Sequence, residues 1–136
     1  MGWYIKYENS SGIIEINYTG DVKDSDLREA SKRRISMQEE TGSNLILVDA
    51  SKSRGGPSAM DLYDLPDKIY PESNVRRDTR IAFVLPQREK ARELAHFFQT
   101  AARNRGWVIE LFDYRENAVS WLISVRGHSK DNSLEK

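Results

Sequence analysis

Residues 44–61 of this chain read Asn44-Leu45-Ile46-Leu47-Val48-Asp49-Ala50-Ser51-Lys52-Ser53-Arg54-Gly55-Gly56-Pro57-Ser58-Ala59-Met60-Asp61. The apolar run at 45–48 is short and bounded by polar residues, which is typical of a strand buried on both faces of a parallel sheet. The serines, cations and glycines that follow it predict a loop, and Ser58 with Asp61 has the spacing of a helix start. Ligands and partners of such sheets meet the protein beyond the carboxyl ends of the strands, so we expect the functional edge here.

The rest of the chain supplies strands and helices in alternation. Two stretches rich in aromatic and β-branched residues, at 3–7 and 13–19, are separated by turn residues and predict an antiparallel hairpin. Helices are predicted over 24–40, 58–70 with a break at Pro66, 87–103 and 113–125, and further strands over 79–85 and 107–112.

This order, β-β-α-β-α-β-α-β-α, predicts an α/β fold in which a mixed, mostly parallel sheet is flanked by helices. We expect a single domain over residues 1–125. Residues 126–136 are polar and patternless, so we expect a disordered tail there.

Composition narrows the classes of function. The 21 Lys and Arg residues balance the 21 Asp and Glu residues, which argues against bulk binding to nucleic acid. The absence of cysteine excludes disulfides and thiol chemistry. No apolar stretch approaches the length of a membrane span, and the amino terminus has no signal-peptide pattern, so we expect a cytoplasmic protein.

Catalytic and metal-binding residues are not evident in the sequence. A serine nucleophile needs a neighbouring base, and the two histidines, His96 and His128, lie in a predicted helix and in the tail. No set of His, Asp and Glu has metal-ligand spacing. We therefore expect a protein that is not an enzyme and that has no cofactor and no metal. An enzyme is the third hypothesis, after the two binding functions described below.

The loop after the buried strand offers a site for an anion or for phosphorylation. Glycines allow backbone amides to approach a ligand, and nearby cations and a helix start add positive charge. The residues of this partner or anion loop are Asp49, Lys52, Arg54, Gly55 and Gly56. A phosphoserine at Ser58 would occupy the same favourable position, with Ser51 and Ser53 as lesser candidates. The simpler alternative is a flexible, solvated connection in which Ser58 only caps a helix.

The interrupted helix at 58–70 offers a second site. A proline kink with an aromatic rim can leave space for a small ligand, although close packing is the more frequent outcome. The residues predicted to line this ligand pocket are Met60, Tyr63, Leu65 and Tyr70.

The chain resembles the SpoIIAA-like (STAS/SEC14-type) family of small bacterial proteins over residues 3–124. The resemblance rests on the order and spacing of several motifs: Leu47-Val48-Asp49, Ser58-Ala59-Met60-Asp61-Leu62-Tyr63-Asp64-Leu65-Pro66, Arg80-Ile81-Ala82-Phe83-Val84, Arg103-Asn104-Arg105-Gly106-Trp107 and Phe112-Asp113-Tyr114-Arg115-Glu116. Family members of the anti-sigma-factor antagonist type carry Asp-x-Ser at the end of this strand and a phosphorylated serine at the next helix start. Asp49-Ala50-Ser51 matches the first part, whereas Arg54-Gly55-Gly56-Pro57-Ser58 replaces the second.

The resemblance implies a non-enzymatic STAS-like regulatory module. Its partner would be another protein, a kinase or an anti-sigma-type regulator, and phosphorylation of a serine at the loop–helix junction would control it. The alternative, which other branches of the family suggest, is a protein of the same fold that binds a small hydrophobic ligand or an anion. The residues predict no oligomeric state.

Overall fold

The computed structural model describes residues 2–55 and 68–124. In chain order its elements are β1 (Trp3–Glu8), β2 (Ile13–Asp21), α1 (Asp24–Thr41), β3 (Leu45–Gly55), α3 (Tyr70–Glu72), β4 (Arg80–Val84), α4 (Glu89–Arg103) and β5 (Val108–Phe112). A last helix over residues 115–124, here the C-terminal helix, follows β5.

The five strands form one sheet in the order in which they occur in the chain, β1-β2-β3-β4-β5. β1 pairs with β2 antiparallel, as the predicted hairpin requires, and the other three pairings are parallel. The predicted α/β fold with a mixed, mostly parallel sheet flanked by helices is therefore confirmed.

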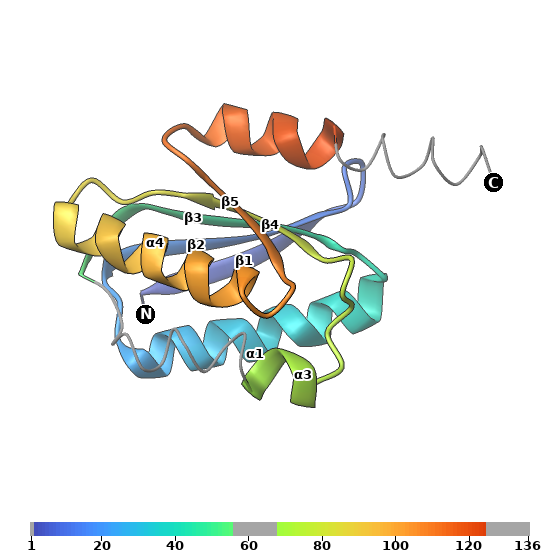
Figure 1. Ribbon diagram of the computed structural model, residues 1–136. Helices are drawn as coiled ribbons and strands as arrows, with labels where there is room; N and C mark the ends of the chain where they lie inside the picture. The colour runs from blue at the N-terminus through green and yellow to red at the C-terminus, as the bar shows by residue number, and fades with distance from the viewer. Residues whose placement is uncertain (1, 56–67, 125–136) are drawn as a thin grey trace.

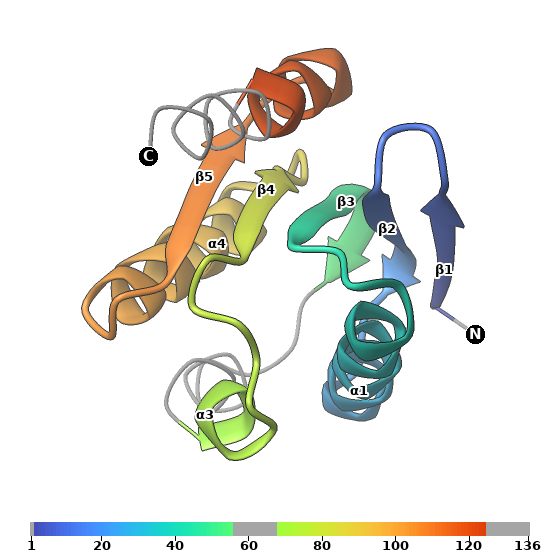
Figure 2. The same cartoon turned by 90° about the vertical axis from the view of Figure 1, so that its right-hand side faces the viewer.

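The helices are distributed unequally over the two faces of the sheet. Figures 1 and 2 show α1, α3 and α4 on one face and the C-terminal helix alone on the other. Right-handed crossovers between parallel strands that advance in one direction across a sheet place all connecting helices on the same side. The second face is left to the C-terminal helix, which covers only part of it.

Two apolar clusters fill the space on the two sides of the sheet. Ile46 belongs to the larger cluster, beneath α1, α3 and α4, and its neighbour Leu47 to the smaller one, beneath the C-terminal helix. Successive side chains of a strand point to opposite faces, so one short run contributes to both cores. Both side chains are fully buried, as expected for the continuous apolar run of a central strand.

Strand β3 is longer than its apolar run predicts. The loop expected from Ser51 onward is extended instead, because residues 52–55 pair with residues 19–21 of β2. At the start of α1, Lys23 stands at the cap position, and its backbone N–H donates to the Asp26 carboxylate at 3.0 Å. Asp26 thus acts from inside the first turn rather than as the cap.

Candidate functional site

The end of β3 projects beyond its neighbour β4. β4 pairs with Leu45–Asp49, whereas β3 continues to Gly55 with β2 as its strand partner. Near the end of β3, the Arg54 carbonyl accepts a hydrogen bond from the Arg88 guanidinium at 3.0 Å. Within residues 2–55 and 68–124, the β4 side of this projecting end has no strand neighbour, which is the arrangement of a sheet edge.

Asp49 and Ser51 hold a bulge where the projecting end begins. Asn17 pairs with Asp49 but Thr19 pairs with Lys52, so β3 has one more residue than β2 over this interval. The Ser51 N–H and hydroxyl both donate to Asp49 Oδ1, at 3.0 and 2.6 Å. The first of these bonds gives the Ser51 backbone N–H a partner at the bulge. Asp49 and Ser51 therefore both have a local structural role.

The other described residues of the predicted loop differ in exposure. Lys52 and Arg54 are exposed. Ser53 is buried, and its hydroxyl donates to the Ala50 carbonyl at 2.7 Å. Gly55 ends the strand. The remaining predicted residues Gly56, Ser58, Met60, Tyr63 and Leu65 lie outside the described residues.

Tyr70, the described member of the predicted ligand pocket, lines a small apolar cavity beneath the helices. The cavity has a volume of about 30 Å³ and is lined by residues of α1, α3, α4 and the sheet. Its lining residues are Ile16, Tyr18, Leu27, Ser31, Arg34, Val48, Tyr70, Ile81, Phe83 and Phe98. Burial raises the pKa of Tyr18 above its usual range, so this phenol remains neutral.

Arg34 is the charged residue of this cavity. Its side chain is only 2% exposed, and its Cζ lies 4.6 Å from the centre of the Tyr70 ring. Nε and Nη2 are buried and have no hydrogen-bond partner within the part of the chain that the structure describes. A guanidinium cannot lose its proton in a protein, so α1 holds a full positive charge against an apolar wall.

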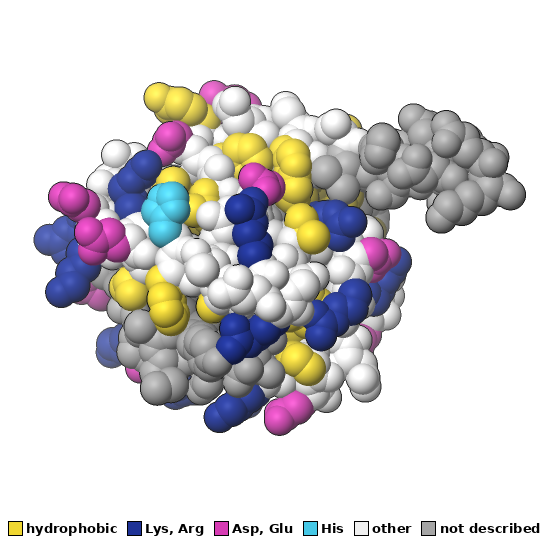
Figure 3. Space-filling view, viewed as in Figure 1, with side chains coloured by type: hydrophobic (Ala, Val, Ile, Leu, Met, Phe, Trp, Pro, Cys, Tyr) yellow, Lys and Arg dark blue, Asp and Glu magenta, His cyan; other side chains and the backbone are white. Residues whose placement is uncertain are grey.

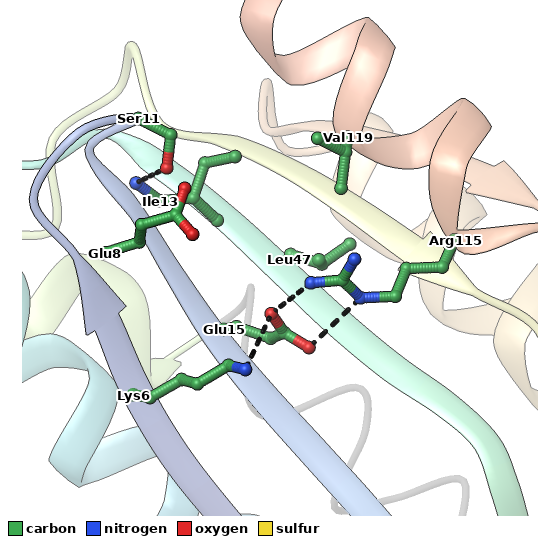
Figure 4. Close-up of a pocket in the computed structure, with 8 residues that line it drawn as sticks. All are labelled: Lys6, Glu8, Ser11, Ile13, Glu15, Leu47, Arg115 and Val119. Atoms are coloured by element: carbon green, nitrogen blue, oxygen red, sulfur yellow. Dashed lines mark hydrogen bonds and ion pairs between the residues drawn. The ribbon is translucent and has the colours of Figure 1, made fainter.

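A second cavity, of about 100 Å³, lies on the opposite face of the sheet beside the C-terminal helix. Figure 4 shows its lining, which consists of Lys6, Glu8, Ser11, Ile13, Glu15, Leu47, Arg115 and Val119. Glu15 lies at its centre and is 6% exposed. Arg115 grips this carboxylate with two hydrogen bonds, Nη2 to Oε1 at 2.6 Å and Nε to Oε2 at 3.3 Å.

The pairs around Glu15 determine its charge state. Burial acts to raise the pKa of Glu15, but hydrogen bonds from Arg115 and Asn17 outweigh it, so this pKa lies below its usual value of 4.5. Lys6 adds an ion pair at 3.9 Å. Glu15 is therefore an ionised carboxylate that ties the C-terminal helix to β2, and its oxygens are already occupied.

Sequence reasoning missed Glu15, Arg115 and Arg34. Glu15 alternates with isoleucines along β2, a pattern typical of a solvent-facing position, but the C-terminal helix reaches over it. Arg34 follows Lys32 and Arg33, and a run of three cations is more typical of a solvated helix face. Helical spacing could have indicated that Arg34 is buried, because the buried residues of α1 recur at three- and four-residue intervals. These residues are Leu27, Ala30, Ser31, Arg34, Ile35 and Gln38.

Neither cavity is lined by a histidine among the described residues. His96 is exposed on α4. Within the described ranges, no group of three or more His, Cys, Asp or Glu residues is placed to hold a metal ion. None of the helices searched there is long and apolar enough to cross a membrane. Figure 3 shows side chains of both signs interspersed over the face on which α4 lies.

Comparison with known proteins defines the class of fold. The chain is similar to the crystal structure of an uncharacterised protein of the DUF3478 family from Shewanella loihica PV-4, which has a SpoIIAA-like fold. The match has a TM-score of 0.57 and 17% sequence identity, and it covers 88% of this chain and 91% of that one. No family model and no curated protein matches the sequence. The protein thus has a SpoIIAA-like fold, in agreement with the resemblance found in its sequence.

Proposed function

We propose that this protein is a non-enzymatic regulatory module that binds a protein partner through the projecting end of β3. The observation that supports the proposal is that, among residues 2–55 and 68–124, β3 has no strand neighbour beyond Asp49 on the β4 side. Such an edge can accept an extended segment of another protein, with main-chain hydrogen bonds supplying affinity. Lys52 and Arg54 are exposed there, so the partner segment is expected to be acidic.

Charge reversal at the projecting end tests this proposal. We expect Lys52→Glu combined with Arg54→Glu to weaken capture of the partner by at least about tenfold, because two attractive contacts become repulsive. The measurement is affinity capture from the source cells with the full chain as bait, followed by quantitative mass spectrometry. Lys32→Glu, at an exposed position of α1, is the matched control. If the double variant captures the same proteins in the same amounts as the control, the projecting end is not the interface.

Serine phosphorylation is the proposed control of this module, with Ser58 as the switch. A phosphoserine adds roughly −1.5 to −2 charges, enough to remove an acidic partner from a basic edge. Ser53 is a poor substrate because its hydroxyl is buried and bonded, and Ser51 is engaged with Asp49.

We therefore expect phosphate on Ser58 in preference to Ser51 and Ser53. Mass spectrometry of the protein purified from its native cells locates it. Ser58→Asp should reduce capture of the partner. Ser58→Ala should leave capture of the partner undiminished but make it independent of phosphorylation. Phosphate found mainly on Ser53, or none under any growth condition, would contradict the switch.

A second candidate function is the binding of a small ligand in the cavity beneath α1, α3 and α4. The observation that favours it is Arg34, whose buried guanidinium has unpaired nitrogens inside an otherwise largely apolar cavity. Binding sites for small molecules are commonly apolar with a few placed polar groups. Native mass spectrometry of the freshly purified protein tests this function directly, since a bound ligand adds its mass to that of the chain.

A further inference from the structure

Arg34 is a buried charged residue whose guanidinium lacks hydrogen-bond partners among the described residues. Among the described residues four buried side-chain atoms lack a hydrogen-bond partner, and two of them are Nε and Nη2 of Arg34. The other two, Trp3 Nε1 and Gln38 Oε1, belong to neutral side chains. A buried polar group without a partner is unfavourable, and a buried charge without one is far more so. Arg34 therefore reduces stability unless a partner from outside the described residues reaches it.

The two unpaired nitrogens define what that partner must be. Nε and Nη2 lie along one edge of the guanidinium plane, which can donate two parallel hydrogen bonds to a planar pair of oxygens. Arg115 shows the completed form of this contact, because its Nε and Nη2 donate to the two carboxylate oxygens of Glu15. Arg34 presents the same edge, and none of the described residues places a carboxylate against it.

The surroundings of Arg34 define the rest of the ligand. The Arg34 Cζ lies over the Tyr70 ring, so an aromatic side chain covers part of the guanidinium. The wall beside it is formed by aliphatic and aromatic side chains of the strands and α4, namely Ile16, Val48, Ile81, Phe83 and Phe98. A volume of about 30 Å³ has room for a group of a few heavy atoms, so the anionic head must be small.

We propose that Arg34 binds the carboxylate of a small amphipathic monocarboxylic acid, and that this carboxylate and the first carbons of its chain occupy the cavity beneath α1, α3 and α4. This inference rests on the second candidate function and names the chemical class of its ligand. A phosphate or sulfate head is disfavoured because it is larger and tetrahedral. An alcohol of the same chain is disfavoured because it leaves the charge of Arg34 uncompensated.

The test compares head groups on one chain length. Hexanoate, hexanol, hexylamine and hexyl phosphate are titrated into the full-length protein, and binding is followed by shifts of amide resonances in two-dimensional NMR spectra. We expect hexanoate to bind at least about tenfold more tightly than hexanol, the effect of one hydrogen-bonded charge pair. Hexylamine is expected not to bind, and hexyl phosphate to bind more weakly than hexanoate.

Variants assign the preference to Arg34. Arg34→Gln should bring hexanoate and hexanol to within about twofold of each other. Arg33→Gln removes the same charge from an exposed position of α1 and should leave the preference intact. If hexanol binds wild-type protein as tightly as hexanoate, or hexyl phosphate binds best, the carboxylate inference is wrong while the ligand-binding function stands. If none of the four probes binds, the second candidate function fails as well.

Thermal unfolding separates this site from a structural role. Without ligand, Arg34→Met should raise the melting temperature or leave it unchanged, because it replaces an unpaired buried charge by an apolar side chain. Hexanoate should raise the melting temperature of the wild type but not that of the variant. A large fall in the melting temperature of Arg34→Met would mean that an acid of this chain already pairs with Arg34, and the inference would be overturned.

Discussion

Replacement of Arg115 by methionine is expected to lower the free energy of unfolding at pH 7 by about 2–3 kcal/mol. The variant keeps much of the side-chain volume but leaves Glu15, whose side chain is 8% exposed, without its main partner. Breaking a buried ion pair from one side typically costs 3–5 kcal/mol. The lower value is expected here because the Arg115 side chain is 50% exposed and Lys6 remains 3.9 Å from the carboxylate. Urea denaturation of the two proteins measures the difference.

Arg33→Met is the matched control for this variant. Arg33 pairs with Glu40 at 3.5 Å, and both side chains are well exposed. Exposed pairs of this kind contribute about 0–1 kcal/mol, so the control should unfold close to the wild type. If the two variants lose the same free energy of unfolding, burial of Glu15 under the C-terminal helix does not make its ion pair more stabilising than an exposed one.

The difference between wild type and Arg115→Met should also depend on pH. The pKa of Glu15 is lowered in the folded protein, so its contribution to stability is present above its unfolded pKa, near 4.5. That contribution is lost as the pH falls through the lower folded value. The two proteins should therefore begin to converge as the pH falls below 4.5, and converge fully only below the lower folded pKa of Glu15. A difference that stays constant from pH 7 to pH 3 would attribute the loss to packing rather than to charge.

The layout of the fold follows from features that the sequence displays openly. Alternation at Ile14 and Ile16, the apolar run before Asp49 and the spacing of Ala95, Phe98 and Ala102 each reflect a single element and its buried side. The projecting end of β3 could not be read in the same way. Its serines, cations and glycine have the composition of a loop, and they are extended because residues 19–21 of β2 lie alongside them.

The candidate sites were harder to predict because each depends on contacts between distant segments. Glu15 and Arg115 are one hundred positions apart, and nothing near either residue indicates the other. Arg34 could be placed on the buried face of α1 by helical spacing, but its lack of a partner is a property of the packed molecule. Local patterns thus predict where a side chain points, and only the fold determines what it meets.

The unequal coverage of the sheet connects the two cavities to the topology. Because the crossovers place α1, α3 and α4 on one side, the apolar cavity with Arg34 lies beneath three helices. On the other side a single helix covers β3 and β4, and the polar side chains Lys6, Glu8 and Glu15 of β1 and β2 lie at its margin. The same chain therefore has an apolar cavity suited to a ligand and a polar one already filled by an ion pair.

Tyr70→Ala is expected to have the largest effect, a loss of about 3–4 kcal/mol in the free energy of unfolding. The Tyr70 side chain is 2% exposed and packs edge to face on Trp107, with ring centres 5.3 Å apart at 79°. The guanidinium of Arg34 also lies over this ring, with Cζ 4.6 Å from its centre. Removal of the ring leaves a hole between α1, α3 and the β5 end of the sheet, and it also uncovers the charge of Arg34.

Two further substitutions identify which part of Tyr70 is responsible. Tyr70→Phe retains both ring contacts and should cost less than about 1 kcal/mol, while Tyr114→Ala, at a position 66% exposed, should change stability by less than about 0.5 kcal/mol. Chemical denaturation of the three variants under one condition gives the comparison. If Tyr70→Phe is as unstable as Tyr70→Ala, a bond of the hydroxyl outweighs the ring contacts. In that case the contact with the aromatic ring would not be what holds Arg34 in place. Tyr70→Phe should then also lose the preference for hexanoate over hexanol. If the ring contact alone holds Arg34, Tyr70→Phe should keep this preference.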